Sequence, residues 1–239
     1  MTELLYQTDA YLQEFEANVF SVMDDQRAIV LDRSAFYPGG GGQPCDLGSL
    51  IISGRTYPVE KVKKQGDDVL HFLGGSEPLP EPNAASRGTL DWSRRYKLMR
   101  THTALHVLCG TVFRDYGALV TGGDMEPLKG RLDFEFESMR GELVREIEAA
   151  INVEVQQARE IRVKTLPRAD AFLIPDLIRT KINLLPEGIA QIRTVEIVGL
   201  DLQADGGTHV NNTSEVGKIR IADYKSKGAI NKRIYIEID

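Results

Sequence analysis

The segment of residues 78–83 contains three prolines within five positions and separates two stretches of chain with different hydrophobic patterns. Proline disfavours a helical conformation at the residue before it and stiffens the chain, so the segment favours an extended connector. We interpret it as the best candidate for a boundary. The chain is therefore expected to form two domains, at residues 1–90 and 91–239.

The first stretch has the pattern of a β-rich domain. Short apolar runs are each bounded by glycine, aspartate or proline, as strands and turns require. The runs occupy residues 27–32, 50–53, 57–62 and 68–73. Short strands at this spacing indicate a small barrel or sandwich.

The second stretch combines helical and strand patterns. Apolar residues at helical spacing predict one helix from about Ser93, its candidate N-cap, to about Asp115, with Gly117 as the stop. Ser138 is the candidate cap of a second helix, which is marked by Leu143, Ile147, Ile151 and Val155. Strands are predicted at residues 131–136, 191–198, 217–221 and 233–238. The fold class is therefore α+β, with helices packed on an antiparallel sheet.

The composition excludes several classes of protein. The 239 residues carry 29 Lys and Arg against 35 Asp and Glu, so the net charge of −6 rules out a histone-like basic protein. The two cysteines, Cys45 and Cys109, are too few for a disulfide framework or a four-cysteine zinc module. No apolar run approaches the roughly 20 residues that span a bilayer, and the N-terminus lacks the pattern of a secretion signal. We expect a cytoplasmic protein with no membrane partner, and the sequence leaves the oligomeric state open.

His102 and His106 lie four positions apart inside the first predicted helix. This spacing places both rings on one helix face, with Cβ atoms about 5–6 Å apart, so both can bind one metal ion. Ordinary packing or surface exposure is the alternative for such a pair. A zincin-type protease is excluded, because that chemistry needs glutamate directly after the first histidine, where Thr103 stands.

A third histidine, His209, follows two glycines and Thr208 in the segment that begins at Asp205. The glycines allow a tight turn that can aim the ring inward, and Asp205 offers a hard oxygen ligand. Three imidazoles, alone or with a carboxylate, suit zinc and can leave one position for water or substrate. The alternative is a simple hairpin with Asp205 as a turn former. Because three of the four histidines fall in these two segments, we favour a zinc site.

Other catalytic arrangements have little support. The sequence contains no Gly-x-Ser-x-Gly elbow, and Cys45 has no neighbouring base along the chain. Cys109 can share a helix face with His102 but is more simply a small buried hydrophobe. His71, in a strand-like run, is expected to be structural or exposed.

Three motifs in this order resemble the editing domain shared by alanyl-tRNA synthetases and the free-standing AlaX proteins. They are the glycine-rich segment of residues 32–48, the HTALH segment of residues 102–106 and the GGTHV segment of residues 206–210, flanked by residues 195–203 and 213–217. The combination is specific although each motif alone is not. The resemblance covers the chain from roughly residue 20 to the end.

The resemblance implies an N-terminal β-barrel, like one found in translation factors, followed by a zinc-binding α+β editing domain. It also implies a zinc-dependent deacylase that hydrolyses the ester joining serine, and sometimes glycine, to alanine tRNA, with the acceptor end of tRNA(Ala) as partner. Because the chain leaves no room for an amino-acid activation domain, we expect the trans-acting, free-standing form. Whether zinc polarises the carbonyl, activates water or mainly orients substrate stays open.

The resemblance assigns one zinc ion to His102, His106 and His209. Asp205 stands where the family commonly has cysteine. A carboxylate oxygen is an acceptable zinc ligand, so we expect Asp205 to coordinate the ion; a water in that position, with Asp205 behind it, is the alternative. Without a thiolate the zinc should be more labile. We assign no catalytic residue beyond this metal site.

Discrimination between serine and alanine depends on one hydroxyl group. A site that hydrogen-bonds this hydroxyl is left with an unpaired polar group when alanine binds, so the discrimination can be large. Thr121 matches a position where the family places a hydroxyl-bearing residue near the amino-acid side chain; a turn or strand-end threonine is the alternative. Gly40, Gly41, Gly42 and Gln43 are the further substrate-binding candidates, because a glycine-dense segment allows close approach of backbone to substrate or to the other domain. This segment is not a nucleotide P-loop, since no Gly-Lys-Ser/Thr follows it.

The segment of residues 218–233 is rich in lysine and arginine, and Asp223 is its one acid. The candidate tRNA-binding residues are Lys225, Lys227, Lys232 and Arg233, to which Arg94, Arg95, Lys97 and Arg100 can add. A basic strip on an acidic protein suits phosphate contacts and predicts affinity that falls with salt. A solvated charged face is the alternative.

Two other functions stay open. One is a deacylase for another mischarged tRNA such as Ser-tRNA(Thr), because that editing domain shares the histidine motifs; the glycine-rich segment favours the alanine system. The other is a non-catalytic tRNA-binding module with a purely structural zinc. A structural site is coordinatively closed, so an open position on the metal would exclude it.

Overall fold

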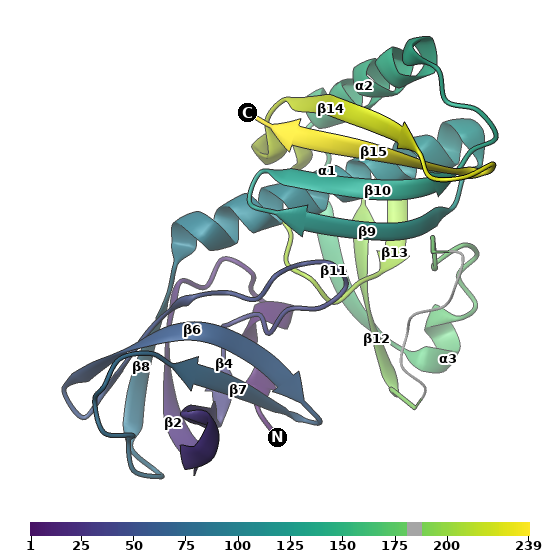
Figure 1. Ribbon diagram of the computed structural model, residues 1–239. Helices are drawn as coiled ribbons and strands as arrows, with labels where there is room; N and C mark the ends of the chain where they lie inside the picture. The colour runs from purple at the N-terminus through teal and green to yellow at the C-terminus, as the bar shows by residue number, and fades with distance from the viewer. Residues whose placement is uncertain (181–187) are drawn as a thin grey trace. The chain divides into compact units, whose positions relative to one another are not determined.

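The computed structural model describes residues 1–180 and 188–239. The chain forms two compact units, Met1–Tyr96 and Lys97–Asp239 (Figure 1). The boundary falls inside the helix α1 (Trp92–Tyr116), a few residues beyond the position expected from the sequence. The reason is that the first turn of α1 packs within the first unit, where the Trp92 ring lies 5.7 Å from the ring of Tyr11.

The first unit contains a closed barrel of antiparallel strands in the order β2-β3-β7-β6-β5-β8. Their bounds are β2 (Glu14–Met23), β3 (Ala28–Leu31), β5 (Gly48–Ile52), β6 (Arg55–Gln65), β7 (Asp68–Leu73) and β8 (Ala85–Leu90). Successive side chains of a strand point to opposite faces, so Phe15, Ala17 and Val19 of β2 are buried while their neighbours face outward. With residues such as Leu50 and Tyr57 they form the apolar interior of the barrel.

Two barrel strands, β2 and β8, lie outside the runs expected from the sequence. The inward positions of β8 are Ser86, Gly88 and Leu90, so its apolar pattern is weak. Gly88 is required by the ring of Phe15, since a Cβ atom at Gly88 would lie 2.4 Å from it. Because β8 follows the prolines and pairs with β2 and β5, residues 78–83 connect two barrel strands and do not separate two domains.

Short elements complete the first unit. The strands β1 (Glu3–Leu4) and β4 (Arg33–Ser34) pair in parallel. The 3-10 helices η1 (Leu5–Gln7) and η2 (Asp24–Gln26) follow β1 and β2. The pairing of β1 with β4 holds the N-terminal residues beside the barrel, and the Thr2 hydroxyl donates to Leu31 O of β3 at 2.9 Å.

The second unit contains an antiparallel sheet in the order β14-β15-β10-β9. Its strands are β9 (Val120–Glu126), β10 (Lys129–Glu135), β14 (Ile219–Ser226) and β15 (Asn231–Ile238). Along β15, Ile234, Ile236 and Ile238 are buried, whereas Arg233 and Tyr235 lie on the more open face. The helix α2 (Gly141–Gln156) packs along β14, where Asn152 hydrogen-bonds both backbone groups of Ile219.

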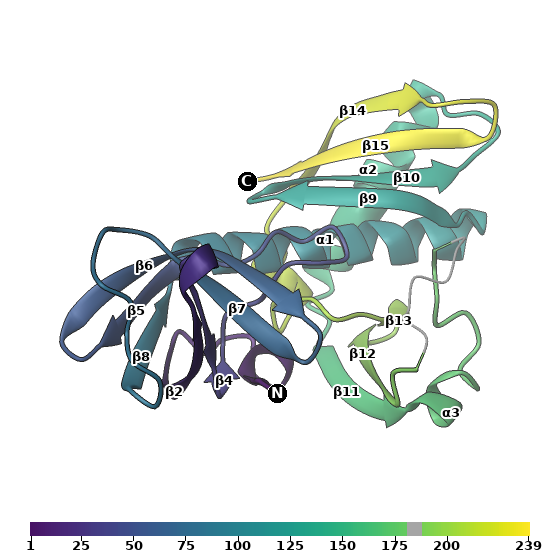
Figure 2. The same cartoon turned by 60° about the horizontal axis from the view of Figure 1, so that its bottom comes forward.

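A second sheet, in the order β11-β12-β13, completes the unit. Its strands are β11 (Ile161–Pro167), β12 (Gln191–Ile197) and β13 (Asp201–Ala204), accompanied by α3 (Arg168–Ala171) and followed by the 3-10 helix η3 (Thr213–Val216). The helix α1 lies between the two sheets (Figure 2), because Gly130 of β10 meets Leu105 and Asp201 of β13 meets Gly110. One face of α1 is thereby turned toward the loop that follows β13.

The helix ends correct two expectations. Ser93 lies inside α1, and the cap is Asp91, whose carboxylate accepts the Arg94 N–H at 3.0 Å. Ser138 does not cap α2 either, because the N-cap residue is Arg140, which makes no side-chain cap bond. Gly117 ends α1 as expected, with a φ of +66° that favours glycine.

The α+β class and the presence of a barrel are confirmed. Within residues 1–180 and 188–239, none of the helices combines the length and the apolar character that crossing a bilayer requires. The packing of α1 against the β11-β12-β13 sheet brings the loop after β13 beside the helix.

Candidate metal centre

The first half of the site is one face of α1. His102 and His106 are both buried, and their ring centroids lie 4.9 Å apart. The four-residue spacing brings them to the same side of the helix, as the sequence predicts. The helix therefore presents two imidazoles from a rigid backbone.

The second half is the loop that leaves β13. The Gly207 N–H donates to Asp205 Oδ2 at 2.8 Å, which closes an Asx turn and explains the short polar residue before the two glycines. The Arg193 guanidinium donates to the Asp205 carbonyl oxygen at 3.0 Å, and the Asp205 N–H donates to the Arg193 carbonyl oxygen. The turn is thus tied to β12, and it directs the His209 ring inward, where it is buried.

The two halves converge. The His209 ring stacks on His102 with centroids 4.2 Å apart and lies 4.6 Å from His106. Asp205 Oδ2 is 3.0 Å from His209 Nε2, and Asp205 Oδ1 is 3.6 Å from His102 Nε2. One potential ligand atom from each of the four residues lies within 4.8 Å of the others. The residues that the sequence nominated as metal ligands therefore form one cluster, which we call the His/Asp cluster.

Burial governs the protonation of this cluster. It lowers the pKa of His102 well below its usual value, and it lowers the pKa of His209 to about 4 despite the bond to Asp205. Burial alone would raise the pKa of Asp205, but His102 and the bond with His209 hold that pKa well below its usual range. Near neutral pH these two imidazoles are therefore uncharged and the carboxylate is ionised. Those are the forms that bind a metal.

The donor set fits a divalent ion such as zinc. His106 Nδ1 is buried and has no hydrogen-bond partner among the described residues. A buried polar atom without a partner is costly, and coordination to a cation is one way to satisfy it. Three imidazoles and one carboxylate are also a donor set that zinc accepts in a tetrahedral site.

Cys109 lies outside the His/Asp cluster. Burial, with the nearby Asp201 carboxylate, raises the pKa of its thiol far above the usual value, so the thiol stays protonated. His71 is buried in the barrel, where its Nε2 lies 2.7 Å from the Ser34 hydroxyl. Cys109 is therefore a small buried residue, as the sequence predicts. His71 was expected to be either structural or exposed, and its burial agrees with the structural alternative.

The glycine-rich segment forms a tight loop in the first unit. Gly39, Gly40, Gly41 and Gly42 have φ values of +82°, +137°, +58° and +89°, a run that other residues cannot adopt without strain. Two backbone hydrogen bonds join Gly40 and Gln43, at 3.0 and 2.9 Å, and close the loop. The need for glycine at Gly41 is conformational, since a Cβ atom there would meet nothing.

Thr121 lies on β9 with an exposed side chain. Its hydroxyl donates to the Asn231 side-chain oxygen at 3.1 Å, past the intervening strand β10. This bond orients the Thr121 hydroxyl along the sheet.

The basic strip of the C-terminal strands is only partly available. Lys225 and Lys227 are exposed, and Lys225 lies 3.1 Å from Asp223. Arg233 donates to both oxygens of Asp133, at 2.6 and 2.8 Å. Lys232 falls on the buried face of β15 by strand alternation, and its ammonium donates to two carbonyl oxygens of the preceding turn.

Two of the basic residues before the histidine pair are committed to the structure. Arg95 is fully buried and pairs with Asp46, which also accepts the Tyr37 N–H. Arg100 donates to the Val216 carbonyl oxygen at 2.8 Å. A basic cluster in the sequence therefore overstates the number of free cations.

Sequence reasoning missed Thr103. Its hydroxyl lies 3.1 Å from His209 Nδ1 and accepts the Val210 N–H at 3.3 Å. Its position directly after His102 was the available signal, but the residue was considered only because it is not glutamate.

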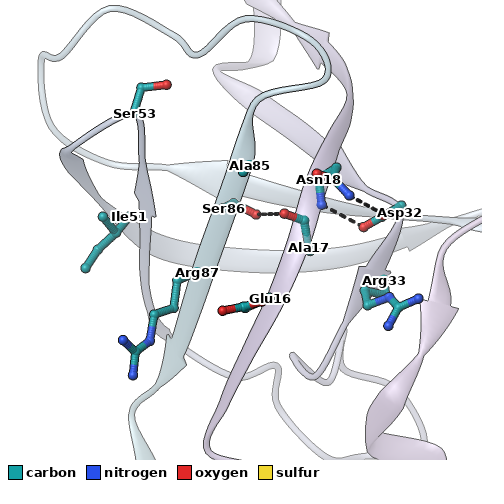
Figure 3. A pocket seen from close by; sticks show the side chains of 10 residues that line it. All are labelled: Glu16, Ala17, Asn18, Asp32, Arg33, Ile51, Ser53, Ala85, Ser86 and Arg87. Atoms are coloured by element: carbon teal, nitrogen blue, oxygen red, sulfur yellow. Dashed lines mark hydrogen bonds between the residues drawn. The ribbon is translucent and has the colours of Figure 1, made fainter.

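A polar hollow on the outside of the barrel has a volume of about 560 Å³ (Figure 3). Glu16 and Asp32 line it together with Arg33 and Arg87, so opposite charges balance. The Asp32 carboxylate accepts two hydrogen bonds from Asn18. The residues that line the hollow include no histidine or cysteine, so the hollow offers no donor set like that of the His/Asp cluster.

The comparisons with known proteins find matches along the whole chain. Residues 192–235 match the family described as threonyl and alanyl tRNA synthetase second additional domain, and residues 5–94 match class II (A) tRNA synthetases. The chain is 38% identical over its whole length to 99% of the alanyl-tRNA editing protein AlaX-M of Saccharolobus solfataricus, and 36% identical to 99% of that of Methanosarcina acetivorans. It is also 37% identical to alanine–tRNA ligase of Ignicoccus hospitalis, in an alignment covering 92% of this chain and 24% of that enzyme.

Proposed function

Because the chain belongs to the AlaX-type family of alanyl-tRNA editing proteins, we propose that it is a deacylase that removes wrong amino acids from alanine tRNA. The convergence of three histidines and one aspartate in the His/Asp cluster is the observation that carries the proposal. Editing proteins that match over their full length favour a protein that acts in trans on the charged tRNA.

The proposed substrate is Ser-tRNA(Ala), with Gly-tRNA(Ala) as a second. In the reaction, water attacks the ester carbonyl, the bond to the terminal ribose oxygen breaks, and that oxygen takes up a proton and leaves as the tRNA hydroxyl. The ester is already activated, so little more than positioning and charge stabilisation is needed.

We propose that His102, His106, His209 and Asp205 hold one zinc ion. When bound, such an ion supplies a Lewis acid beside the reacting ester. The Gly207 N–H holds Asp205 Oδ2, which leaves Oδ1 as the oxygen offered to the ion. His102 and His209 need lose no proton when they bind the ion, because burial already keeps the pKa of both imidazoles low.

Thr121, Gly40, Gly41, Gly42 and Gln43 are the proposed substrate-binding residues. The Thr121 hydroxyl can rotate, and it accepts as well as donates, so it is able to pair with a serine hydroxyl while keeping Asn231. Thr121→Val is expected to reduce the preference for serine over alanine by at least about tenfold. Measuring both deacylation rates tests this, and an unchanged ratio would exclude the assigned role.

Lys225, Lys227 and Arg233 form the proposed contact with the acceptor end of tRNA(Ala). Exposure favours the two lysines most. Lys232 is left out of this surface, because its ammonium is buried and bonded to backbone. Phosphate contacts from exposed cations give a binding constant that falls steeply with salt.

The decisive experiment is a deacylation assay with serine-, glycine- and alanine-charged tRNA(Ala) and with serine-charged tRNA(Thr). The last substrate is included because the matching family covers threonyl as well as alanyl synthetases. We expect rapid release of serine from tRNA(Ala), protection of alanine, loss of activity with a chelator and its return with zinc. Release of serine from tRNA(Thr) alone would reassign the substrate.

His102→Ala and His209→Ala test whether the His/Asp cluster is needed for the reaction. Each removes one proposed ligand and is expected to abolish serine release. His71→Gln is the matched control, because it replaces a buried histidine of the barrel. If either cluster variant hydrolyses Ser-tRNA(Ala) at the normal rate, the His/Asp cluster does not act in the reaction.

A further inference from the structure

The Thr103 side chain joins the two halves of the site, because its hydroxyl lies within hydrogen-bond distance of Nδ1 of the cluster residue His209. It is fully buried on α1, between the two cluster histidines of that helix. Its hydroxyl oxygen lies 3.1 Å from His209 Nδ1 and accepts the Val210 N–H at 3.3 Å. It thus contacts a residue more than a hundred positions away in the loop after β13.

The two nitrogens of His209 face different partners. Nδ1 faces Thr103, and Nε2 faces Asp205 Oδ2 at 3.0 Å and the rest of the cluster. A neutral imidazole carries one proton, and the bond made by one nitrogen decides the role of the other. An imidazole that binds a metal through Nε2 must carry its proton on Nδ1 and needs an acceptor there.

A threonine hydroxyl can serve both forms of the ring. Without an ion, it donates to Nδ1 while the Nε2–H donates to Asp205. With Nε2 bound to an ion, the Nδ1–H donates to the hydroxyl oxygen instead. A hydroxyl has one hydrogen and two lone pairs, so it can accept from Val210 in both cases. The ring therefore keeps its orientation when the ion enters.

From this arrangement we infer that Thr103 is a positioning residue that fixes the His209 ring with Nε2 toward the metal. The inference rests on the metal site of the proposed function and adds to it a residue that touches neither metal nor substrate. Outer partners of this kind typically change metal affinity 10- to 100-fold when they are removed.

The test uses the whole protein and Co²⁺, whose absorption in the visible range reports four-coordinate geometry. Thr103→Val keeps the shape of the side chain and removes the hydroxyl, and Thr103→Ser keeps the hydroxyl. Affinity for Co²⁺ and Zn²⁺ is measured by competition with a coloured chelator. We expect Thr103→Val to weaken binding by about 10- to 100-fold and to alter the Co²⁺ spectrum, and Thr103→Ser to bind within about threefold of the unsubstituted protein.

Thr111→Val is the matched control. Thr111 is also fully buried on α1, but its hydroxyl has no hydrogen-bond partner among the described residues. The same substitution there should leave metal affinity unchanged. If valine acted only by disturbing α1, metal affinity would fall in both Thr103→Val and Thr111→Val, or Thr103→Ser would bind metal no better than Thr103→Val. Either result overturns the inference.

The outcomes separate the inference from the proposed function. If the unsubstituted protein binds neither Co²⁺ nor Zn²⁺, the metal centre itself is refuted. If it binds both and Thr103→Val binds equally well, only the role of Thr103 is refuted. Should Thr103→Val fail to fold, nitrogen NMR of the Zn²⁺-loaded unsubstituted protein decides: a proton on His209 Nδ1 supports the inference, and a proton on Nε2 overturns it.

Discussion

Replacing Arg95 with methionine should strongly destabilise the first unit. The Arg95 side chain is fully buried and donates to Asp46, to the Ala10 carbonyl oxygen at 2.8 Å and to the Ala35 carbonyl oxygen at 2.6 Å. Methionine fills similar space but leaves the Asp46 carboxylate, which is 1% exposed, without its cation. Breaking a buried pair from one side typically costs 3–5 kcal/mol, so we expect a loss of about 4 kcal/mol.

The single tryptophan of the chain makes this loss measurable. Trp92 lies in the first turn of α1 and packs on Tyr11 and Tyr96 within the first unit. Its fluorescence therefore follows unfolding of this unit in urea. For a denaturant dependence of about 1.5 kcal/mol per molar, a loss of about 4 kcal/mol lowers the urea midpoint by about 2–3 M.

Two further variants sharpen the measurement. Arg94→Met changes the neighbouring residue, whose guanidinium makes long bonds of 3.3 and 3.4 Å to the Cys45 carbonyl oxygen, and should cost less than about 1 kcal/mol. Adding Asp46→Asn to Arg95→Met removes the unpaired charge and should recover part of the loss. An Arg95→Met midpoint as high as that of Arg94→Met would refute the reasoning, because the buried pair would then not support the barrel.

Other perturbations test separate parts of the molecule. Burial lowers the pKa of His71 to about 4 from an ordinary value near 6.5, so only the unfolded chain takes up this proton as the pH falls from 6.5 to 4. The contribution of His71 to the free energy of unfolding should therefore be complete above pH 6.5 and fall by about 3 kcal/mol by pH 4. Urea unfolding at several pH values should show that His71→Gln removes this part of the pH dependence. An equal pH dependence in the variant would contradict the prediction. Asp205→Cys supplies a thiolate and should tighten zinc binding by at least about tenfold in a chelator competition, whereas unchanged affinity would show that the side chain at 205 does not touch the ion. Replacing Lys225 and Lys227 together with alanine should flatten the dependence of log K for tRNA on log salt by about 2, and a slope equal to that of the unsubstituted protein would place the RNA elsewhere.

The sequence alone predicted features that depend on neighbours along the chain. The spacing of His102 and His106 sets their common helix face, and the glycines after Asp205 permit the turn that directs His209. The motifs also identified the family, since three segments in order carry more information than any one of them. These predictions succeed because helix periodicity and turn geometry are local properties.

The tertiary structure decided which of these residues meet and which basic residues are free. Arg95 and Lys232 look like surface cations in the sequence, but one pairs with Asp46 and the other falls on the buried face of β15. Thr103 looks like a spacer, yet it reaches His209 across more than a hundred positions. Side-chain hydrogen bonds between distant segments depend on how α1 packs between two sheets, and no periodicity along the chain encodes that packing.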